Sequence, residues 1–236
     1  MPGPELSAVV LCYRAESDIN AVLEPLHRQL EASGHSFELV LVANFWPGQE
    51  DTTPEVVKSF ANAHDRAVVL SEPKQGGMGW DFRCGLEAAS GDIIIVIDGD
   101  SQNPTEDVLR MFTMMRDTGA EVMKGLRIAR YDSLYRRFIS VVYNFLFRFL
   151  FGTTGLWDIN GKPKGLTRSA YDEMKLTSDD WFIDAEIVLE AQRLGLRVAE
   201  MPVVFRRNDY RQSFIKPDAV FEFLGNMLAR RVRIRS

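Results

Sequence analysis

Residues 91–104 read Gly-Asp-Ile-Ile-Ile-Val-Ile-Asp-Gly-Asp-Ser-Gln-Asn-Pro. Five consecutive β-branched residues predict a buried strand, and Pro104 stands where the first turn of a following helix would begin. Asp98 and Asp100 are two positions apart, so their side chains point to the same side of an extended chain. The stretch therefore predicts a strand that delivers two carboxylates to one edge of a sheet.

The side chains of Asp98, Asp100 and Gln102 together form an incomplete shell of oxygen donors. Mg²⁺ and Mn²⁺ accept such donors, and the open positions suit phosphate oxygens. Gly99 lets a ligand approach the backbone between the two carboxylates. Asp and Gly after a strand are also ordinary turn residues, so a structural turn is the alternative interpretation of this motif. The combination with the rest of the chain favours the metal site.

Strands and helices alternate on both sides of this stretch. The apolar runs predict strands at 7–12, 37–42, 67–70, 93–97 and 121–125. Helical spacing of apolar residues predicts helices at 18–33, 54–63, 79–89 and 105–117. Alternating elements of this kind predict an α/β fold with a mostly parallel sheet flanked by helices, and with ligands at the carboxyl ends of the strands.

Composition and charge limit the class of protein. The chain has 236 residues with 46% hydrophobic content, which suits one large domain. Its net charge of −5 argues against a nucleic-acid partner, whereas residues 124–168 hold nine Lys or Arg against two Asp and suit phosphate groups or an anionic membrane surface. Two cysteines, no secretory signal and no membrane-spanning run predict a reduced, cytoplasmic protein.

The order and spacing of several motifs resemble a known family. Tyr13-Arg14-Ala15-Glu16 follows the first strand, and residues 85–92 lead into the Asp-Gly-Asp-Ser-Gln motif at 98–102. These motifs resemble glycosyltransferase family 2, which has the GT-A fold, and most of all the polyprenyl-phosphate glycosyltransferases of the dolichol-phosphate mannose synthase type. The resemblance continues through 125–127, 136–144, 158–164, 181–186 and 200–203. It covers nearly the whole chain.

The resemblance implies one GT-A domain with a C-terminal acceptor-side region. Residues 1–126 would form the half that binds nucleotide-sugar and metal, and residues 127–236 the acceptor-side half with an interfacial amphipathic helix. The implied reaction is a metal-dependent, inverting transfer of a mannose- or glucose-type sugar from a GDP- or UDP-linked donor to a polyprenyl phosphate, with Mg²⁺ or Mn²⁺ as cofactor.

The resemblance and the chemistry of the side chains together assign candidate roles to individual residues. The metal ligands would be Asp98, Asp100 and Gln102. The residues that carry the chemistry would be Asp100, Asp158, Arg127 and Arg137. The donor contacts would be Tyr13, Glu16, Asn44, Gly76, Asp98, Arg207, Arg211 and Lys216. Gly76 belongs to a glycine-rich loop, residues 72–79, which is a weak candidate for a phosphate cradle because it lacks the established spacings.

Two departures from the family pattern concern the donor. The family usually has Asp-Asp-Gly-Ser after the second strand, with an Asp that contacts the base, and this chain has Ala-Asn-Phe-Trp at 43–46. Asn44 can still hydrogen-bond to the edge of a base. Its preference among bases would differ from that of Asp, because an amide donates hydrogen bonds as well as accepting them. Near the C-terminal end the family's arginine is displaced. The basic side chains that could replace it as a diphosphate contact are those of Arg206, Arg207, Arg211 and Lys216.

The acceptor leaves alternatives open. A phosphate acceptor is already anionic near neutral pH and needs no strong base. An alcohol acceptor needs a carboxylate near the attacking oxygen, and Asp158, Asp184 and Glu186 are the candidates. The third alternative is a non-catalytic GT-A-like binding or scaffold protein, suggested by the missing Asp at position 43 or 44.

Residues 138–151 form a stretch rich in Phe and Leu that is too short and too interrupted to span a bilayer. Arg136, Arg137 and Arg148 accompany it, as in a helix that lies in a membrane interface. The stretch predicts peripheral contact with the inner face of the membrane. A buried helix or a dimer contact is the alternative.

Overall fold

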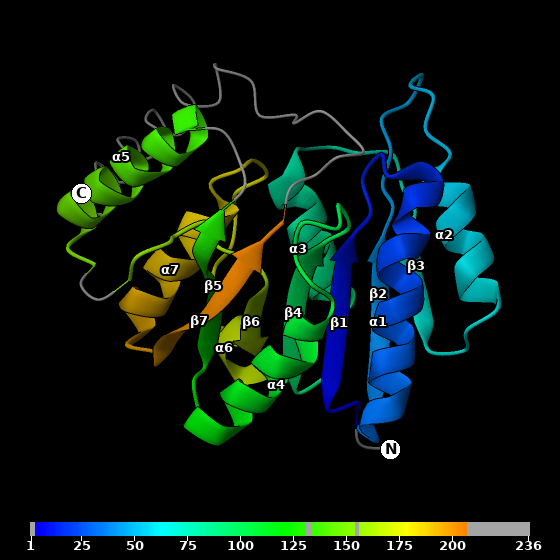
Figure 1. Ribbon diagram of the computed structural model, residues 1–236, viewed down its shortest axis with the longest axis horizontal. Coiled ribbons are helices and arrows are strands. Elements are labelled where there is room, and N and C mark those ends of the chain that lie inside the picture. The colour runs from blue at the N-terminus through cyan, green and yellow to red at the C-terminus, as the bar shows by residue number, and fades with distance from the viewer. Residues whose placement is uncertain (1–2, 131–133, 154–155, 207–236) are drawn as a thin grey trace.

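The computed structural model describes residues 3–130, 134–153 and 156–206 (Figure 1). The strands are β1 (Leu6–Leu11), β2 (Phe37–Val42), β3 (Ala67–Leu70), β4 (Ile93–Asp98), β5 (Val122–Arg130), β6 (Lys164–Thr167) and β7 (Val198–Phe205). The helices are η1 (Glu16–Ile19, a 3-10 helix), α1 (Asn20–Ser33), α2 (Thr53–Asn62), α3 (Met78–Ala88), α4 (Glu106–Thr118), α5 (Leu134–Phe151), α6 (Arg168–Glu173) and α7 (Ile183–Leu194). Every element predicted before residue 126 is present.

The strands form a single seven-stranded sheet in the order β3-β2-β1-β4-β6-β5-β7. All neighbouring pairs are parallel except those of β6, which runs antiparallel to both β4 and β5. The prediction of a mostly parallel sheet flanked by helices is confirmed. The sequence did not predict β6, because Lys-Gly-Leu-Thr is short and contains a single β-branched residue.

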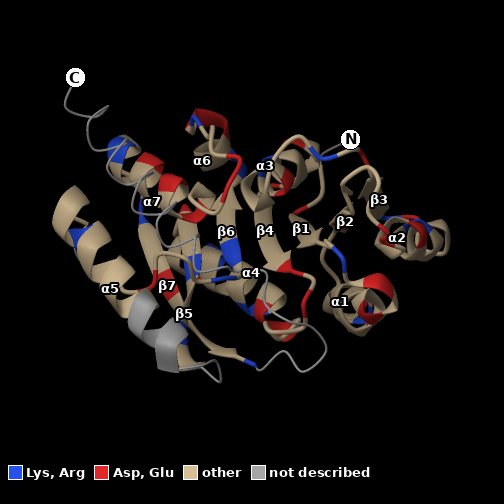
Figure 2. Cartoon of the chain, turned by 90° about the horizontal axis from the view of Figure 1, so that it is seen from above, with Lys and Arg blue, Asp and Glu red and all other residues tan. Residues whose placement is uncertain are grey.

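Helices cover both faces of the sheet, and each face has its own hydrophobic core (Figure 2). Ile95 and Ile97 of β4 pack with α1 and α4, whereas Ile94 and Val96 pack on the other face with α3 and α7. Successive side chains of a strand point to opposite faces, so a strand buried on both sides needs an unbroken apolar run. This explains the Ile-Ile-Ile-Val-Ile sequence of β4.

Helix α5 lies beyond the sheet and packs on α7 (Figure 1). The side chains that join the two helices are buried: Tyr143, Phe147, Phe151, Ile159, Phe182, Ala185 and Val188. Of these, Tyr143, Phe147 and Phe151 form one stripe of α5 at helical spacing, and Val141, Phe145 and Phe149 on the opposite side are exposed. Within the described residues, no helix combines the length and hydropathy that crossing a membrane requires.

Candidate active site

The predicted metal motif lies at the carboxyl edge of the sheet. Asp98 ends β4 beside Leu11, the last residue of β1, and Leu11 is in turn aligned with Val42 of β2. The loops that follow β1, β2 and β4 therefore leave the sheet at the same edge. This register brings the segments of the predicted donor contacts Tyr13 and Asn44 to the same side as the carboxylates.

The loop after β4 is held in place by its own backbone and by the end of β7. The backbone N–H of Gln102 donates to Asp100 Oδ1 at 3.0 Å, and Ser101 has a positive φ of 61°. The Gln102 side chain donates to the carbonyl of Arg206 at 3.1 Å, and the Arg206 N–H donates to the carbonyl of Gln102 at 2.8 Å. Gln102 thus ties the metal motif to the strand that leads into the basic C-terminal segment.

A lysine that sequence reasoning did not single out lies against the motif. Lys162 Nζ is 2.6 Å from Asp98 Oδ1, and the Lys162 side chain is buried. Burial opposes the charge of this side chain, but Asp98, Asp184 and Asp100 together raise the pKa of Lys162 above its usual value. The motif therefore has an ammonium group beside its first carboxylate.

Asn44, a predicted donor contact in the loop after β2, is buried, and its side-chain amide is hydrogen-bonded to other parts of the protein. Its Oδ1 accepts from the N–H of Glu72 at 2.9 Å, and its Nδ2 donates to Asp81 Oδ1 at 3.0 Å. Asp81 is also paired with Lys74, whose ammonium lies 4.7 Å from the centre of the Tyr13 ring. Burial raises the pKa of Asp81, although Lys74 acts in the opposite direction.

The glycine-rich loop at 72–79 is packed against the segment before α7. A Cβ atom on Gly76 would lie 2.9 Å from Asp179 Cβ, and one on Gly79 would lie 2.4 Å from the carbonyl oxygen of Asp180. The N–H of Trp80 also donates to the carbonyl of Asp179 at 3.2 Å. Close packing of two backbones therefore accounts for these glycines, and a donor contact by Gly76 stays a prediction.

Arg127 and Asp158, both predicted to take part in the chemistry, form a two-pronged ion pair. Arg127 Nε lies 2.6 Å from Asp158 Oδ2, and Nη2 lies 2.6 Å from Oδ1. Burial opposes the charge of Asp158, but the guanidinium holds the pKa of this carboxyl below its ordinary value. Both carboxylate oxygens of Asp158 therefore accept hydrogen bonds from Arg127.

The two other carboxylates considered for an alcohol acceptor are buried and engaged as well. Asp184 Oδ1 is 2.5 Å from Lys164 Nζ. Glu186 accepts from the backbone N–H groups of Thr177 and Ser178 at 2.9 and 2.7 Å, and from the Thr177 hydroxyl at 2.8 Å. The three carboxylates thus hold together parts of the second half of the chain.

Glu200 links three parts of the chain at this side. Its Oε1 accepts from Lys124 Nζ and from the backbone N–H groups of Trp157 and Asp158, the last two at 2.8 and 3.1 Å. Burial lowers the pKa of Lys124, although Glu200 acts in the opposite direction. The ion pair thereby attaches the segment around Asp158 to β5 and β7.

Comparison with known proteins adds to this geometry. The model of the family described as glycosyl transferase family 2 matches residues 7–174, well over half of the chain. The chain belongs to glycosyl transferase family 2. This confirms the family that the motifs predicted.

Curated relatives of this family 2 chain include polyprenyl-phosphate glycosyltransferases. It is 26% identical over 218 residues to a dolichyl-phosphate beta-glucosyltransferase of Trichomonas vaginalis, covering 86% of this chain and 66% of the relative. It is 30% identical over 214 residues to the glycosyltransferase AglD of Haloferax volcanii, covering 85% and 33%. An undecaprenyl-phosphate 4-deoxy-4-formamido-L-arabinose transferase of Salmonella paratyphi B is 27% identical over 146 residues, covering 61% and 43%. The chain spans less than two thirds of each relative's length.

Solved structures show the same fold. Glucosyl-3-phosphoglycerate synthase from Mycobacterium tuberculosis, in complex with Mn²⁺, UDP-glucose and phosphoglyceric acid, superposes with a TM-score of 0.74 at 19% identity, over 97% of this chain and 80% of that one. Mannosyl-3-phosphoglycerate synthase from Rubrobacter xylanophilus superposes with a TM-score of 0.76 at 16% identity, over 98% and 75%. These likenesses confirm the GT-A fold of the family 2 chain.

Other predicted site residues of this family 2 member have different surroundings. Glu16 begins η1 with a φ of 48°, and its N–H donates to the hydroxyl of Thr53 at 2.8 Å, which holds the loop after β1 against α2. The structure does not describe the side chain of Arg137. It also does not describe Arg207, Arg211 and Lys216. Their predicted roles stay predictions.

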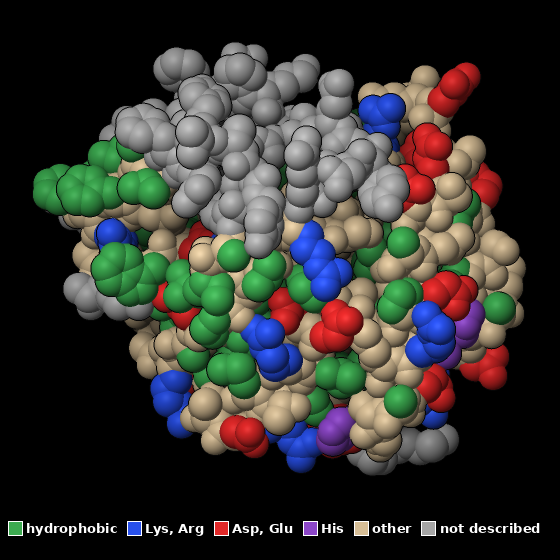
Figure 3. All heavy atoms as spheres, viewed as in Figure 1, with side chains coloured by type: hydrophobic (Ala, Val, Ile, Leu, Met, Phe, Trp, Pro, Cys, Tyr) green, Lys and Arg blue, Asp and Glu red, His purple; other side chains and the backbone are tan. Residues whose placement is uncertain are grey.

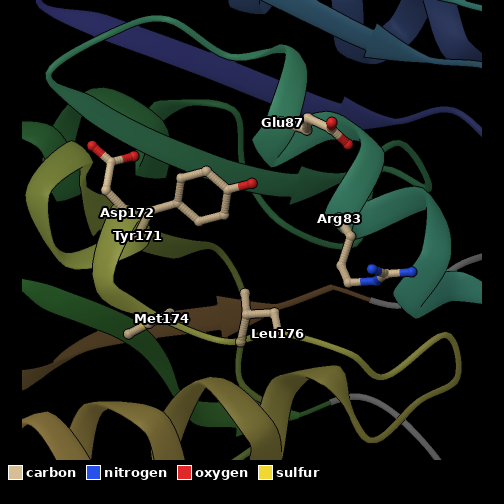
Figure 4. A pocket seen from close by; sticks show the side chains of 6 residues that line it. All are labelled: Arg83, Glu87, Tyr171, Asp172, Met174 and Leu176. Atoms are coloured by element: carbon tan, nitrogen blue, oxygen red, sulfur yellow. The ribbon is translucent and has the colours of Figure 1, made fainter.

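A pocket of about 320 Å³ lies between α3 and α6 of the family 2 chain (Figure 4). Arg83 and Glu87 enter it from α3, and Tyr171 and Asp172 from α6. None of the predicted site residues that the structure describes lines this pocket. We therefore assign no part of the family 2 reaction to it.

The buried lysine of the Lys164–Asp184 pair gives this family 2 chain a pH-dependent stability. Burial lowers the pKa of Lys164 to about 8 from 10.5, although Asp184 acts in the opposite direction. Between these two values the unfolded state binds more protons than the folded state, so the stability that this group contributes rises with pH. We expect the free energy of unfolding of the wild type, relative to Lys164→Met, to increase between about pH 8 and pH 10 in urea unfolding. A difference that stays constant or shrinks over this range would contradict the prediction.

Proposed function

We propose that this chain transfers a mannose- or glucose-type sugar, with inversion, from a nucleotide diphosphate donor to a polyprenyl phosphate. The observation that carries the proposal is that three carboxylates already have partners in the protein: those of Asp158, Asp184 and Glu186. Each of these carboxylates is buried and engaged with a cation or with backbone N–H groups. A base held in this way is a poor proton acceptor for an alcohol, whereas a phosphate acceptor needs none. The names of the relatives that act with dolichyl and undecaprenyl phosphates support the same acceptor class.

The residues at the carboxyl edge of β4 fit a divalent cation. Mg²⁺ and Mn²⁺ commonly bind through one or two carboxylates and complete their shell with substrate phosphates and water. Asp100, with Asp98 and Gln102 beside it, would hold the ion. The ion supplies charge stabilisation for the leaving diphosphate when bound.

The basic groups of the acceptor side would bind and orient phosphates. Asp158 holds the Arg127 guanidinium in one position, so we assign Asp158 a positioning role for Arg127. Gln102 and Arg206 are joined by two hydrogen bonds, so Arg206 lies beside the metal motif. This supports Arg206 as a diphosphate contact, whereas Arg207, Arg211 and Lys216 lie outside the described residues and are proposed from the resemblance in sequence. Arg137 belongs to the same proposal as a phosphate contact.

Donor recognition is proposed for the loops after β1 and β2. Tyr13 lies in the first of these loops, Glu16 begins η1 at its end, and Asn44 lies in the second loop. Because both ends of the Asn44 amide are engaged, we propose that Asn44 acts by orienting Asp81. The donor is a GDP-linked sugar if the site binds guanine and a UDP-linked sugar if it binds uracil. Testing a panel of both kinds of donor distinguishes them.

The test compares two acceptors that differ in one group. GDP- and UDP-linked sugars are incubated with the protein, Mn²⁺ or Mg²⁺ and either a polyprenyl phosphate or the matching polyprenol, and label is counted in the lipid extract. We expect chelator-sensitive label with the phosphate and none with the alcohol. Label on the polyprenol would favour the hydroxyl-acceptor alternative. Absence of nucleotide binding in calorimetry would favour the scaffold alternative.

We propose in addition that α5 contacts the inner face of the membrane peripherally. Val141, Phe145 and Phe149 follow one another at four-residue spacing and are 67%, 60% and 77% exposed. Trp157 is also exposed and lies under the guanidinium of Arg148, 4.6 Å from its ring centre. Figure 3 shows hydrophobic side chains gathered at the end of the molecule where α5 lies. Aromatic residues next to a cation are typical of a membrane interface.

The double substitution Phe145→Asp and Phe149→Asp is expected to lower binding to anionic liposomes by about a hundredfold or more. Burying one such side chain is worth about 1.5 to 3 kcal/mol, and both would be lost. Cosedimentation measures the effect. Val68→Asp changes an exposed apolar residue of β3 and is the matched control, expected to bind as the wild type does. Unchanged liposome binding together with loss of a dimer would support a dimer contact instead.

A further inference from the structure

Lys162 is held at the metal motif by contacts of its backbone as well as its side chain. Its carbonyl accepts from Asn103 Nδ2 at 2.8 Å, and the carbonyl of the next residue, Pro163, accepts from the N–H of Gly125 at 2.9 Å. Its ammonium lies 3.6 Å from Met78 Sδ and 5.5 Å from the centre of the Phe82 ring. These contacts enclose the side chain, which is 5% exposed. Its position beside Asp98 is therefore built into the fold.

We infer that Lys162 is a built-in counter-ion for Asp98 that weakens metal binding in the absence of the donor. Its Nζ lies 2.6 Å from Asp98 Oδ1, which is the distance of a charge-assisted hydrogen bond. A cation that approaches Asp98 meets an ammonium group beside that carboxylate, and the positive charge of the ammonium weakens the attraction between the cation and the motif. The diphosphate of the donor adds negative charge at the same edge. The metal ion therefore binds well only together with the nucleotide.

The neighbouring buried lysines do not have this arrangement. Lys124 is paired with Glu200, and Lys164 with Asp184, and neither of these carboxylates belongs to the Asp98-Gly99-Asp100 motif. Lys124 and Lys164 hold strands and loops together on the acceptor side. Lys162 instead places its charge where the metal would bind. This inference rests on the proposed metal-dependent function and adds a residue that sets the affinity of the metal.

The experiment measures Mn²⁺ binding without any turnover. Free Mn²⁺ is titrated by electron paramagnetic resonance against the protein without nucleotide. Lys162→Met removes the charge and keeps an apolar stem, and we expect it to bind Mn²⁺ at least tenfold more tightly than the wild type, because one unit charge a few ångströms away is removed. Lys162→Arg keeps the charge and should bind as the wild type does. Lys162→Gln is measured as well, and takes the place of Lys162→Met if that variant does not fold.

A double variant tests whether the tighter Mn²⁺ binding comes from the carboxylate of Asp98, which loses its lysine partner in Lys162→Met. Adding Asp98→Asn to Lys162→Met should abolish the gain, since the released carboxylate is then absent. The wild type is also titrated with Mn²⁺ in the presence of UDP or GDP. If it binds Mn²⁺ there, but Lys162→Met and Lys162→Gln bind Mn²⁺ without nucleotide no more tightly than the wild type does without nucleotide, the inference is wrong and the proposed function stands. If no variant binds Mn²⁺ with or without UDP or GDP, both the inference and the metal dependence are wrong.

Discussion

Asp100→Asn is expected to lower the rate of sugar transfer by about a thousandfold. Removing one group that stabilises developing charge costs about a hundred- to a thousandfold in rate, and Asp100 would also hold the ion that performs this stabilisation. Asn retains a carbonyl oxygen that can accept the hydrogen bond from the Gln102 N–H, so the loop should keep its shape. The rate is measured at saturating donor over a range of Mn²⁺ concentrations.

Asp92→Asn is the matched control for this substitution. Asp92 precedes β4 at its amino end, where its side chain is exposed, so the same chemical change is made at the opposite edge of the sheet. We expect its transfer rate to stay within about twofold of the wild type, as for a surface substitution of small energy. If Asp100→Asn retained a third or more of the activity, Asp100 would not be the principal metal ligand.

Asp184→Ala is expected to destabilise the folded protein by about 3 to 5 kcal/mol. The substitution leaves Lys164, which has no exposed side-chain surface, without its carboxylate partner. The carbonyl oxygens of Ile159 and of residue 184 itself, both 3.2 Å from Lys164 Nζ, can accept hydrogen bonds but carry no full charge. Since domains are stable by about 5 to 15 kcal/mol, this loss is a large fraction of the total. Urea unfolding measures it.

Two comparisons identify the cause of this loss. Glu31→Ala breaks the exposed ion pair with Arg66 and should cost less than about 1 kcal/mol. The double variant Asp184→Leu with Lys164→Met replaces both charges by apolar groups and should recover much of the stability. If the double variant were as unstable as Asp184→Ala, lost packing rather than an uncompensated charge would be the cause.

The fold was predictable where the pattern is local. The unbroken run of β4 is typical of a strand with both faces covered, and the Asp-Gly-Asp turn after it is found at the predicted edge of the sheet. Strand β6 could not be predicted, because its four residues form a strand only by pairing with β4 and β5, which are distant in sequence.

The acidic residues of the candidate site could be named from the sequence, as could Arg127, the partner of Asp158, but the buried lysines that pair with the other carboxylates could not. Lys124, Lys162 and Lys164 belong to a basic segment that suggested a surface for phosphates or membrane, yet all three are buried. Their carboxylate partners lie 76, 64 and 20 residues away in sequence. Such pairs become visible only when the strands are placed side by side. Part of the apparent basic surface is therefore internal charge compensation.

Strands β5 and β6 are antiparallel neighbours, with Lys124 paired to Lys164. They follow one another in the sequence and are connected by residues 131–163. Because the cost of closing a loop grows slowly with its length, by about 0.6 kcal/mol for each doubling, such a connection tolerates large changes in size. Helix α5 lies within this connection, which leaves the sheet and returns to it at neighbouring strands. The connection thus has the properties of an exchangeable module, whose length can change while β5 and β6 keep their pairing.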